Sequence, residues 1–154
     1  SGKMEYKEVP TDINAVCEDI VFLSKLKYKE GVEIHFEKTI PDCIVLTDTQ
    51  RVQQVVSNLL NNAMKFTNKG EIRVGYEILP DKFLRIYVKD TGIGIDEQDL
   101  ERVFGRLVKL NKDISGWGLG LHICKSIVHE LGGTMGVESK KGEGSKFWFT
   151  LPVK

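Results

Sequence analysis

Two glycine-containing segments hold the residues with the clearest chemical potential. Asp90 leaves an alternating apolar run and is followed by Gly92 and Gly94. A carboxylate at such a point can accept a hydrogen bond from a buried amino group, while glycines let the backbone approach a flat ligand closely. The second segment, residues 116–121, opens an expected helix, where free backbone N–H groups and the helix dipole favour phosphate. Together the segments predict a nucleotide with its base at Asp90 and its phosphates near residues 116–121.

A third group of polar residues follows one face of another expected helix. Asn58, Asn62 and Lys65 are four and three residues apart, which places them on a common helical face. Magnesium takes oxygen ligands and keeps several waters, and lysine supplies a point charge for phosphate. Alone, the two asparagines are more simply explained as solvated surface residues, but the glycine segments favour a site. Phe66 suits either the core or an aromatic wall against a purine.

These residues depend on a small set of helices and strands for their positions. Helical periodicity and caps predict helices from residues 11–12 to about Tyr28, from Asp48 or Thr49 to near Thr67, and over residues 118–131. Alternation predicts strands at residues 5–9, 32–37, 44–46, 71–79, 83–89, 134–139 and 145–151, and a short helix is expected around residues 99–104. Since helices and strands do not alternate strictly and two hairpins are antiparallel, we expect an α+β, two-layer sandwich. It has three main helices on one face of a mixed, mostly antiparallel sheet.

Length and composition bound the kind of protein. The 154 residues suffice for one domain, and 22 basic residues balance 22 acidic ones, so we expect no nucleic-acid partner. No apolar stretch approaches the ~20 residues that span a bilayer, which argues against membrane insertion of this fragment. The three cysteines lack zinc or disulfide spacing, which favours free thiols in a reducing cytoplasm. Because Ser1 and Gly2 are typical of a cloning scar, we assign residues 1–3 to a tag remnant and linker and residues 4–154 to the domain.

The three motifs together resemble those of one known family. Residues 58–67 (NLLNNAMKFT) look like the N box of sensor histidine kinases, and residues 90–95 (DTGIGI) and 116–121 (GWGLGL) resemble their two glycine boxes. The order and spacing match over roughly residues 5–152. The chain therefore resembles the catalytic and ATP-binding domain of the GHKL superfamily, which gyrase, heat-shock chaperone and mismatch-repair ATPases share.

The resemblance implies an ATP site and a role for each matching residue. The superfamily's Bergerat fold is the sandwich expected above. By resemblance, Asp90 holds the adenine amino group, Gly92 and Gly94 hold the edge of the base, and Phe66 flanks the adenine. Contacts with the phosphates are implied for Lys65, Lys109, Gly116, Gly118, Leu119 and Gly120.

One position in the N box separates a kinase from a hydrolase. The superfamily's ATPases resemble one another in having a glutamate four residues before the magnesium asparagine, where it activates water. Here Asn62 is the implied magnesium ligand, and Asn58 stands at the glutamate position as a catalytic candidate and a second candidate ligand. A neutral amide cannot take a proton from water, so ATP is preserved for transfer. We therefore predict a protein-histidine kinase module that uses ATP and Mg²⁺.

The resemblance also implies partners that lie outside this chain. In the family, the acceptor histidine stands in a separate helical dimerisation domain, and a response regulator acts downstream. His129-Glu130 mimics the acceptor dipeptide, but its place after the second glycine box indicates a structural residue at a helix end. We expect a cytoplasmic, monomeric fragment of a parent protein that can be membrane-anchored.

Two departures from the family's pattern keep other functions open. Residues 103–110 resemble the F box of the lid over the nucleotide, but Leu107 stands where the family usually has a second aromatic residue, and a basic role is open for Arg106. Trp117 stands where a small residue is common. These departures favour a degenerate ATP-binding module that regulates a partner, and a GHKL ATPase is a further alternative. The intact Asn62, Asp90 and glycine boxes argue for the kinase.

Overall fold

Five strands form the main sheet of the computed structural model, which describes residues 5–27, 29–104 and 117–153, without the side chains of residues 117–119. The strands lie in the order β2 (Val32–Glu37), β4 (Gly70–Leu79), β5 (Phe83–Asp90), β7 (Gly144–Pro152) and β6 (Met135–Lys140). β2 runs parallel to β4, and the other neighbours are antiparallel. The predicted mixed, mostly antiparallel sheet is confirmed.

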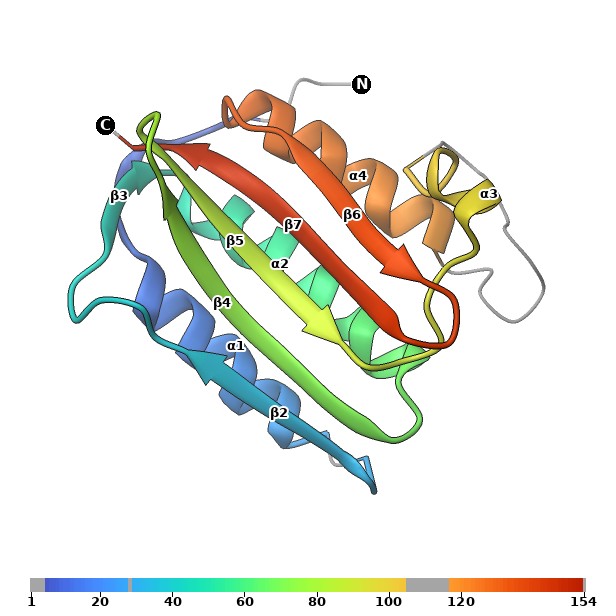
Figure 1. Ribbon diagram of the computed structural model, residues 1–154. Coiled ribbons are helices and arrows are strands. Elements are labelled where there is room, and N and C mark those ends of the chain that lie inside the picture. Colours follow the sequence, from blue (N-terminus) through green and yellow to red (C-terminus); the bar gives the residue numbers. More distant parts are fainter. Residues whose placement is uncertain (1–4, 28, 105–116, 154) are drawn as a thin grey trace.

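Three helices cover one face of this sheet, and no described element covers the other (Figure 1): α1 (Ile13–Lys25), α2 (Thr49–Phe66) and α4 (Trp117–Glu130). The N-terminal caps of the first two are local. The side chain of Asp12 accepts from the backbone N–H of Ala15 at 3.0 Å, and that of Asp48 accepts from Arg51 at 3.1 Å. Such caps satisfy a backbone donor that has no partner inside the helix. The expected two-layer sandwich is confirmed.

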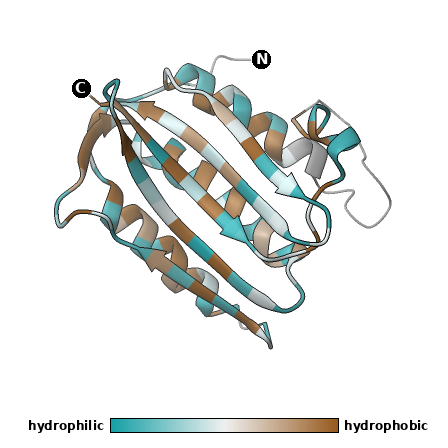
Figure 2. Cartoon of the chain, in the orientation of Figure 1, coloured by the Kyte–Doolittle hydropathy of each residue, from teal (hydrophilic) through white to brown (hydrophobic). Residues whose placement is uncertain are grey.

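The hydrophobic core lies between the helical layer and the sheet. Figure 2 shows hydrophobic residues alternating with hydrophilic ones along the strands, as expected when one face is buried and the other is open. The buried hydrophobic side chains of the two central hairpin strands are those of Ile72, Val74, Tyr76, Leu84, Ile86 and Val88. Helix α2 contributes the predicted stripe, with Val52, Val56, Leu59 and Ala63 all buried. The core therefore fixes α2 against the strand that ends at Asp90.

The structure corrects three predicted boundaries. The first strand is β1 (Val9–Asp12) instead of residues 5–9, because it pairs with β3 (Ile44–Thr47) in a separate two-stranded sheet. Helix α1 ends at Lys25, short of Tyr28, which lies outside the described residues. A tight turn ends it, in which the N–H of Leu26 donates to the carbonyl of Leu23 at 3.2 Å. The short helix α3 (Glu97–Leu100) starts directly after Asp96 and gives way to turns, so the predicted helix at residues 99–104 lay too far along the chain.

In the part of the chain that the structure describes, none of the helices has the length and apolar character needed to cross a membrane.

Candidate functional site

Asp90 stands at the end of β5 with one carboxylate oxygen engaged and the other available. Its side chain is buried, with 6% of its surface exposed. Oδ1 accepts from the backbone N–H of Gly92 at 2.8 Å and of Ser145 at 3.3 Å. None of the hydrogen bonds between described residues uses Oδ2. The backbone therefore orients the carboxylate and leaves an acceptor for an outside donor.

The surroundings of Asp90 disfavour its charge. Burial raises the pKa of the Asp90 carboxyl above its usual range, because the ionised form loses solvation. The two backbone N–H donors act in the opposite direction and do not fully offset burial. A ligand that brings an amino group to this carboxylate supplies Oδ2 with a donor that none of the described residues provides.

The glycine loop after Asp90 is held by close backbone contacts. A Cβ atom on Gly92 would lie 2.3 Å from the carbonyl oxygen of Phe66, and one on Gly94 would lie 2.2 Å from that of Lys140. Gly94 also has a φ of +72°, which L side chains rarely adopt. Between the two glycines, the N–H of Ile93 donates to the Phe66 carbonyl at 3.1 Å. Both glycines are therefore required sterically, and the loop is fixed to the end of α2.

The β6–β7 hairpin supports this loop from the other side, which the sequence did not reveal. The hydroxyl of Ser139 accepts from the N–H of Ile95 at 2.8 Å and lies 2.7 Å from the hydroxyl of Ser145. The N–H of Gly142 donates to the carbonyl of Ile93 at 2.7 Å. The contacts of Ile95 with Ser139 and of Ile93 with Gly142 join segments more than forty residues apart. The sequence of residues 139–145 alone indicated only the turn of a hairpin. Ser139 and Ser145 are thus supporting residues that the sequence motifs did not name.

The three polar residues of α2 have different surroundings. The amide nitrogen of Asn58 donates to the carbonyl of Gly120 at 3.4 Å, so this side chain lies against the first turn of α4. The amide nitrogen of Asn62 is buried without a hydrogen-bond partner among the described residues. Lys65 is exposed, and its Nζ lies 5.7 Å from the centre of the Phe66 ring. The amide nitrogen of Asn58 thus has a partner among the described residues, and the amide nitrogen of Asn62 has none.

Phe66 and the first turn of α4 complete the described part of the site. The Phe66 side chain is 6% exposed and belongs to the hydrophobic core. Gly118, Leu119 and Gly120 lie in the first turn of α4, where backbone N–H groups have no acceptor within the helix. Lys109 and Gly116 lie outside the described residues, as do Arg106 and Leu107. Trp117 is the first residue of α4, and its side chain is among those that the structure does not describe.

The chain that leads toward the expected lid is anchored on the sheet. Val103 is 1% exposed. The ring of Phe104 meets that of Phe147 edge-on, with ring centres 6.2 Å apart. Lys125 of α4 places its Nζ 5.6 Å from the centre of the Phe104 ring. The start of the F-box segment is therefore fixed beside α4 and β7.

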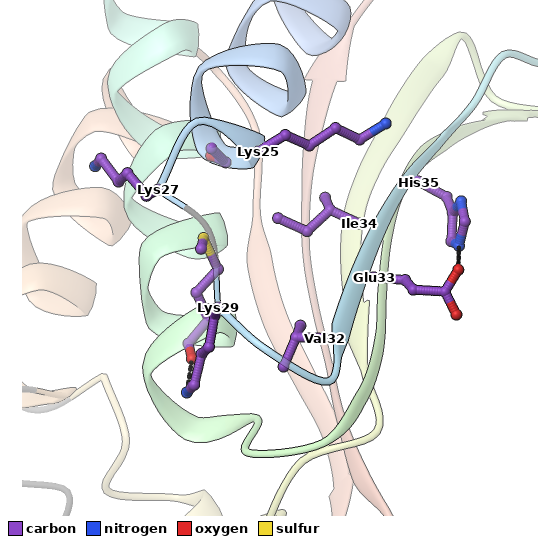
Figure 3. Close-up of a pocket in the computed structure, with 9 residues that line it drawn as sticks. Lys25, Lys27, Lys29, Val32, Glu33, Ile34 and His35 are labelled. Atoms are coloured by element: carbon purple, nitrogen blue, oxygen red, sulfur yellow. Dashed lines mark hydrogen bonds and ion pairs between the residues drawn. The ribbon is translucent and has the colours of Figure 1, made fainter.

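A second hollow, of about 270 Å³, lies between the end of α1 and β2 (Figure 3). Three lysines line it, but their ammonium groups point in different directions. Lys29 donates to the carbonyl of Met64 at 2.6 Å, while Lys25 and Lys27 extend to opposite sides. Nε2 of His35 lies 3.6 Å from Oε1 of Glu33. The lysines do not converge, so this hollow is not a second phosphate site.

Comparisons with known proteins agree with this geometry. Residues 47–154 match the family described as "Histidine kinase-, DNA gyrase B-, and HSP90-like ATPase". The autoinducer 2 sensor kinase/phosphatase LuxQ of Vibrio vulnificus is 39% identical over 138 residues, which are 82% of this chain and 16% of LuxQ. Full-length ShkA, in a crystal structure with AMPPNP, has a TM-score of 0.89 and 30% identity over 99% of this chain and 32% of its own. Histidine kinase ThkA in complex with the response regulator TrrA has a TM-score of 0.81 and 26% identity over 97% of this chain and 42% of the matched chain.

The family and the fold confirm the resemblance found in the sequence motifs. The chain spans 11% to 38% of three curated sensor kinases that it matches, and it covers 97% of the isolated ThkA catalytic domain. It therefore corresponds to one domain of these larger proteins. The chain belongs to the family of histidine kinase-, DNA gyrase B- and HSP90-like ATPases, among the catalytic domains of sensor histidine kinases.

Proposed function

We propose that this chain binds Mg-ATP and delivers the γ-phosphoryl group to a histidine on a separate dimerisation domain. The observation that carries the proposal is the buried Asp90 carboxylate, which has one oxygen fixed by backbone donors and the other not used by any described residue. An exocyclic amino group is the partner that such an acceptor lacks. Gly92 and Gly94 let the loop beside this carboxylate pack closely against Phe66 and Lys140. ShkA, a similar protein, is seen with an ATP analogue.

The phosphates of the nucleotide would lie between α2 and the first turn of α4. The N–H groups of residues 118–120 would donate to phosphate oxygens, supported by the helix dipole. Lys65 is exposed and free to reach toward them, and we assign the same role to Lys109 and Gly116 from the motif alone. These groups would hold and orient the nucleotide, which is most of what phosphoryl transfer requires of a protein.

The residues present fit a magnesium ion bound mainly by the nucleotide and water. No group of three or more His, Cys, Asp or Glu suited to a metal occurs among the residues described. Asparagine binds magnesium through its amide oxygen, and none of the hydrogen bonds between the described residues uses the Oδ1 of Asn62, the ligand that the motif implies, whereas the Nδ2 of Asn58 ties that side chain to Gly120. When bound, magnesium neutralises charge on the phosphate oxygens. We therefore assign the metal to Asn62, with Asn58 in a supporting position.

The absence of a base at residue 58 favours transfer over hydrolysis. Asn58 is a neutral amide, and its nitrogen is used to hold α4. It cannot activate water at neutral pH, so bound ATP persists until an acceptor arrives. We propose that this acceptor is a histidine of the parent protein and that a response regulator follows it, as the pairing of ThkA with TrrA suggests. We also propose a cytoplasmic location and a monomeric state for the isolated domain.

Calorimetric titration of ATP, with and without Mg²⁺ and with phosphate release followed in the same sample, tests this function. We expect magnesium-assisted binding with negligible hydrolysis. In Asn62→Ala the benefit of magnesium should disappear, while Asn61→Ala, an exposed neighbour on α2, should behave like the wild type. Steady turnover would indicate an ATPase, and the absence of binding would indicate a regulatory module. An equal magnesium effect in Asn62→Ala would exclude this residue as the ligand.

A further inference from the structure

Buried polar atoms without partners are concentrated at the end of α2. Among the described residues, three side-chain atoms are buried and lack a hydrogen-bond partner: Asn62 Nδ2, Thr67 Oγ1 and Arg85 Nε. Native proteins rarely leave such groups unsatisfied, and those that remain often have a functional reason. The Asn62 amide belongs to the proposed phosphate end of the site. Thr67 is assigned no contact with base, phosphate or metal in the proposed site, and its side chain is completely buried.

The Thr67 hydroxyl lies beside the adenine-binding carboxylate without contacting it. Thr67 caps the C-terminus of α2 with an extended backbone, which turns its side chain toward the loop after β5. The point where Gly92 would carry a Cβ atom is 2.9 Å from Thr67 Oγ1 and 3.0 Å from Asp90 Oδ1. Both oxygens therefore flank the same glycine. None of the hydrogen bonds between the described residues joins them, although a hydroxyl and a carboxylate make a strong pair.

Nucleotide binding changes what the Asp90 carboxylate needs. Oδ1 already accepts two backbone N–H groups. An amino group at Oδ2 favours the ionised form and a fixed carboxylate plane. A turn of the carboxylate or of the Thr67 side chain would bring the hydroxyl into hydrogen-bond distance beside Gly92, which both groups flank. The hydroxyl, which has no partner among the described residues, would then gain one when the base binds.

We propose that Thr67 is a positioning residue for adenine recognition, whose hydroxyl donates to the Asp90 carboxylate when the base is bound. This inference rests on the proposed function. It assigns to Thr67 a part in selecting adenine that acts through Asp90 and that the sequence motifs did not suggest. A purely structural threonine would instead contribute only its shape at the C-cap.

Thr67→Val and Thr67→Ser separate these two roles. Valine keeps the branched shape and removes the hydroxyl, while serine keeps the hydroxyl. Calorimetric titration of ADP and GDP should show ADP binding weakened about tenfold in Thr67→Val and nearly unchanged in Thr67→Ser. The preference for ADP over GDP should shrink in the valine variant. Thermal unfolding without nucleotide should show Thr67→Val as stable as the wild type or more stable, because an unpartnered hydroxyl is removed.

Three results would overturn the inference. Wild-type ADP affinity in Thr67→Val would do so while leaving the proposed function intact. A lower unfolding temperature of nucleotide-free Thr67→Val, with Thr67→Ser unchanged, would mean that the hydroxyl already has a partner in the free protein. Failure of the wild type to bind ADP would overturn the inference and the proposed function together.

Discussion

Asp90 affects folding and binding in opposite directions. Burial raises the pKa of its carboxyl in the folded state above the value in the unfolded chain. A group with a raised folded pKa contributes stability below its unfolded pKa of about 3.9 and loses that contribution as the pH rises through the folded value. At neutral pH the ionised Asp90 therefore costs stability. The same negative charge, which burial leaves poorly solvated, makes the carboxylate a strong acceptor for a ligand's amino group.

Asp90→Asn should separate these two effects. The amide oxygen can still accept from Gly92 and Ser145, while the amide nitrogen faces an adenine amino group as a second donor. We expect nucleotide-free Asp90→Asn to be at least as stable as the wild type at pH 7, with the difference shrinking toward pH 4. ATP affinity should fall by about 1 to 3 kcal/mol. Chemical denaturation at both pH values and calorimetry measure these quantities, and unchanged ATP affinity would refute the adenine assignment.

The contact between α2 and α4 depends on the pair Asn58 and Gly120. A Cβ atom on Gly120 would lie 2.9 Å from Asn58 Oδ1, closer than such contacts normally are. The glycine therefore sits in the first turn of α4 although it is a poor helix former. This packing brings the N-terminus of α4 to the polar face of α2. The spacing of the motifs indicated both helices but could not show that they meet through these two residues.

A double-mutant cycle tests this contact. Alanine favours the helix over glycine by up to about 1 kcal/mol, so Gly120→Ala should by itself stabilise α4. The methyl group of the new alanine, however, would meet the Asn58 side chain. In an Asn58→Ala background the methyl group has room, so Gly120→Ala should stabilise the protein there and be neutral or destabilising in the wild type. Urea denaturation of the four variants gives the coupling. Asn61→Ala serves as the control background, and equal effects of Gly120→Ala in all backgrounds would argue against the packing.

The elements that the sequence predicted well are those with local causes. The caps Asp12 and Asp48 bond to residues three positions away, and the alternating strands reflect one buried face. The errors arose where distant pairing decides. β1 begins at Val9 because it pairs with β3, and the contact from Ile95 to Ser139 depends on a hairpin far along the chain. Periodicity within one segment carries no information about such partners.

The same limit applies to the candidate site. Asp90, Asn62 and the glycines could be named because each combines a reactive or permissive residue with a characteristic spacing. Thr67 and Ser139 could not, since their side chains matter only through the residues that the fold brings beside them. Threonine and serine are common in turns and caps, so their types alone give no signal. Only the packing of α2 and the β6–β7 hairpin against the glycine loop identifies them.

In the described part of the molecule, charged residues on the open sheet face are paired. Arg73 bridges Glu37 and Glu71 at 3.1 and 3.0 Å, and the Arg85 guanidinium lies 4.8 Å from the centre of the Trp148 ring. Trp148 thus lies on the open face of the sheet, between the buried Phe147 and Phe149. With a net charge of zero, attraction of ATP has to come from local groups such as Lys65 and the start of α4.

The three cysteines report on the integrity of the whole core. Cys17, Cys43 and Cys124 are free and buried in the layer between helices and sheet. Burial raises the pKa of Cys17 and Cys124 to about 12 and raises that of Cys43 in the same direction. Because the thiolate is the reactive form, both access and ionisation oppose modification in the folded state.

Thiol titration with Ellman's reagent at pH 8 should therefore give almost no fast reaction in the native protein and three thiols after unfolding in guanidinium. Slow native reaction should proceed at the rate at which the core opens, so it should accelerate with sub-denaturing urea. ATP with Mg²⁺ should slow the modification of Cys124 in particular, because α4 carries this thiol and is held by the bound phosphates in the proposed site. Modification of each cysteine can be followed by mass spectrometry of peptides. Rapid labelling of any one thiol in the native protein would contradict the packing of the layer in which it lies.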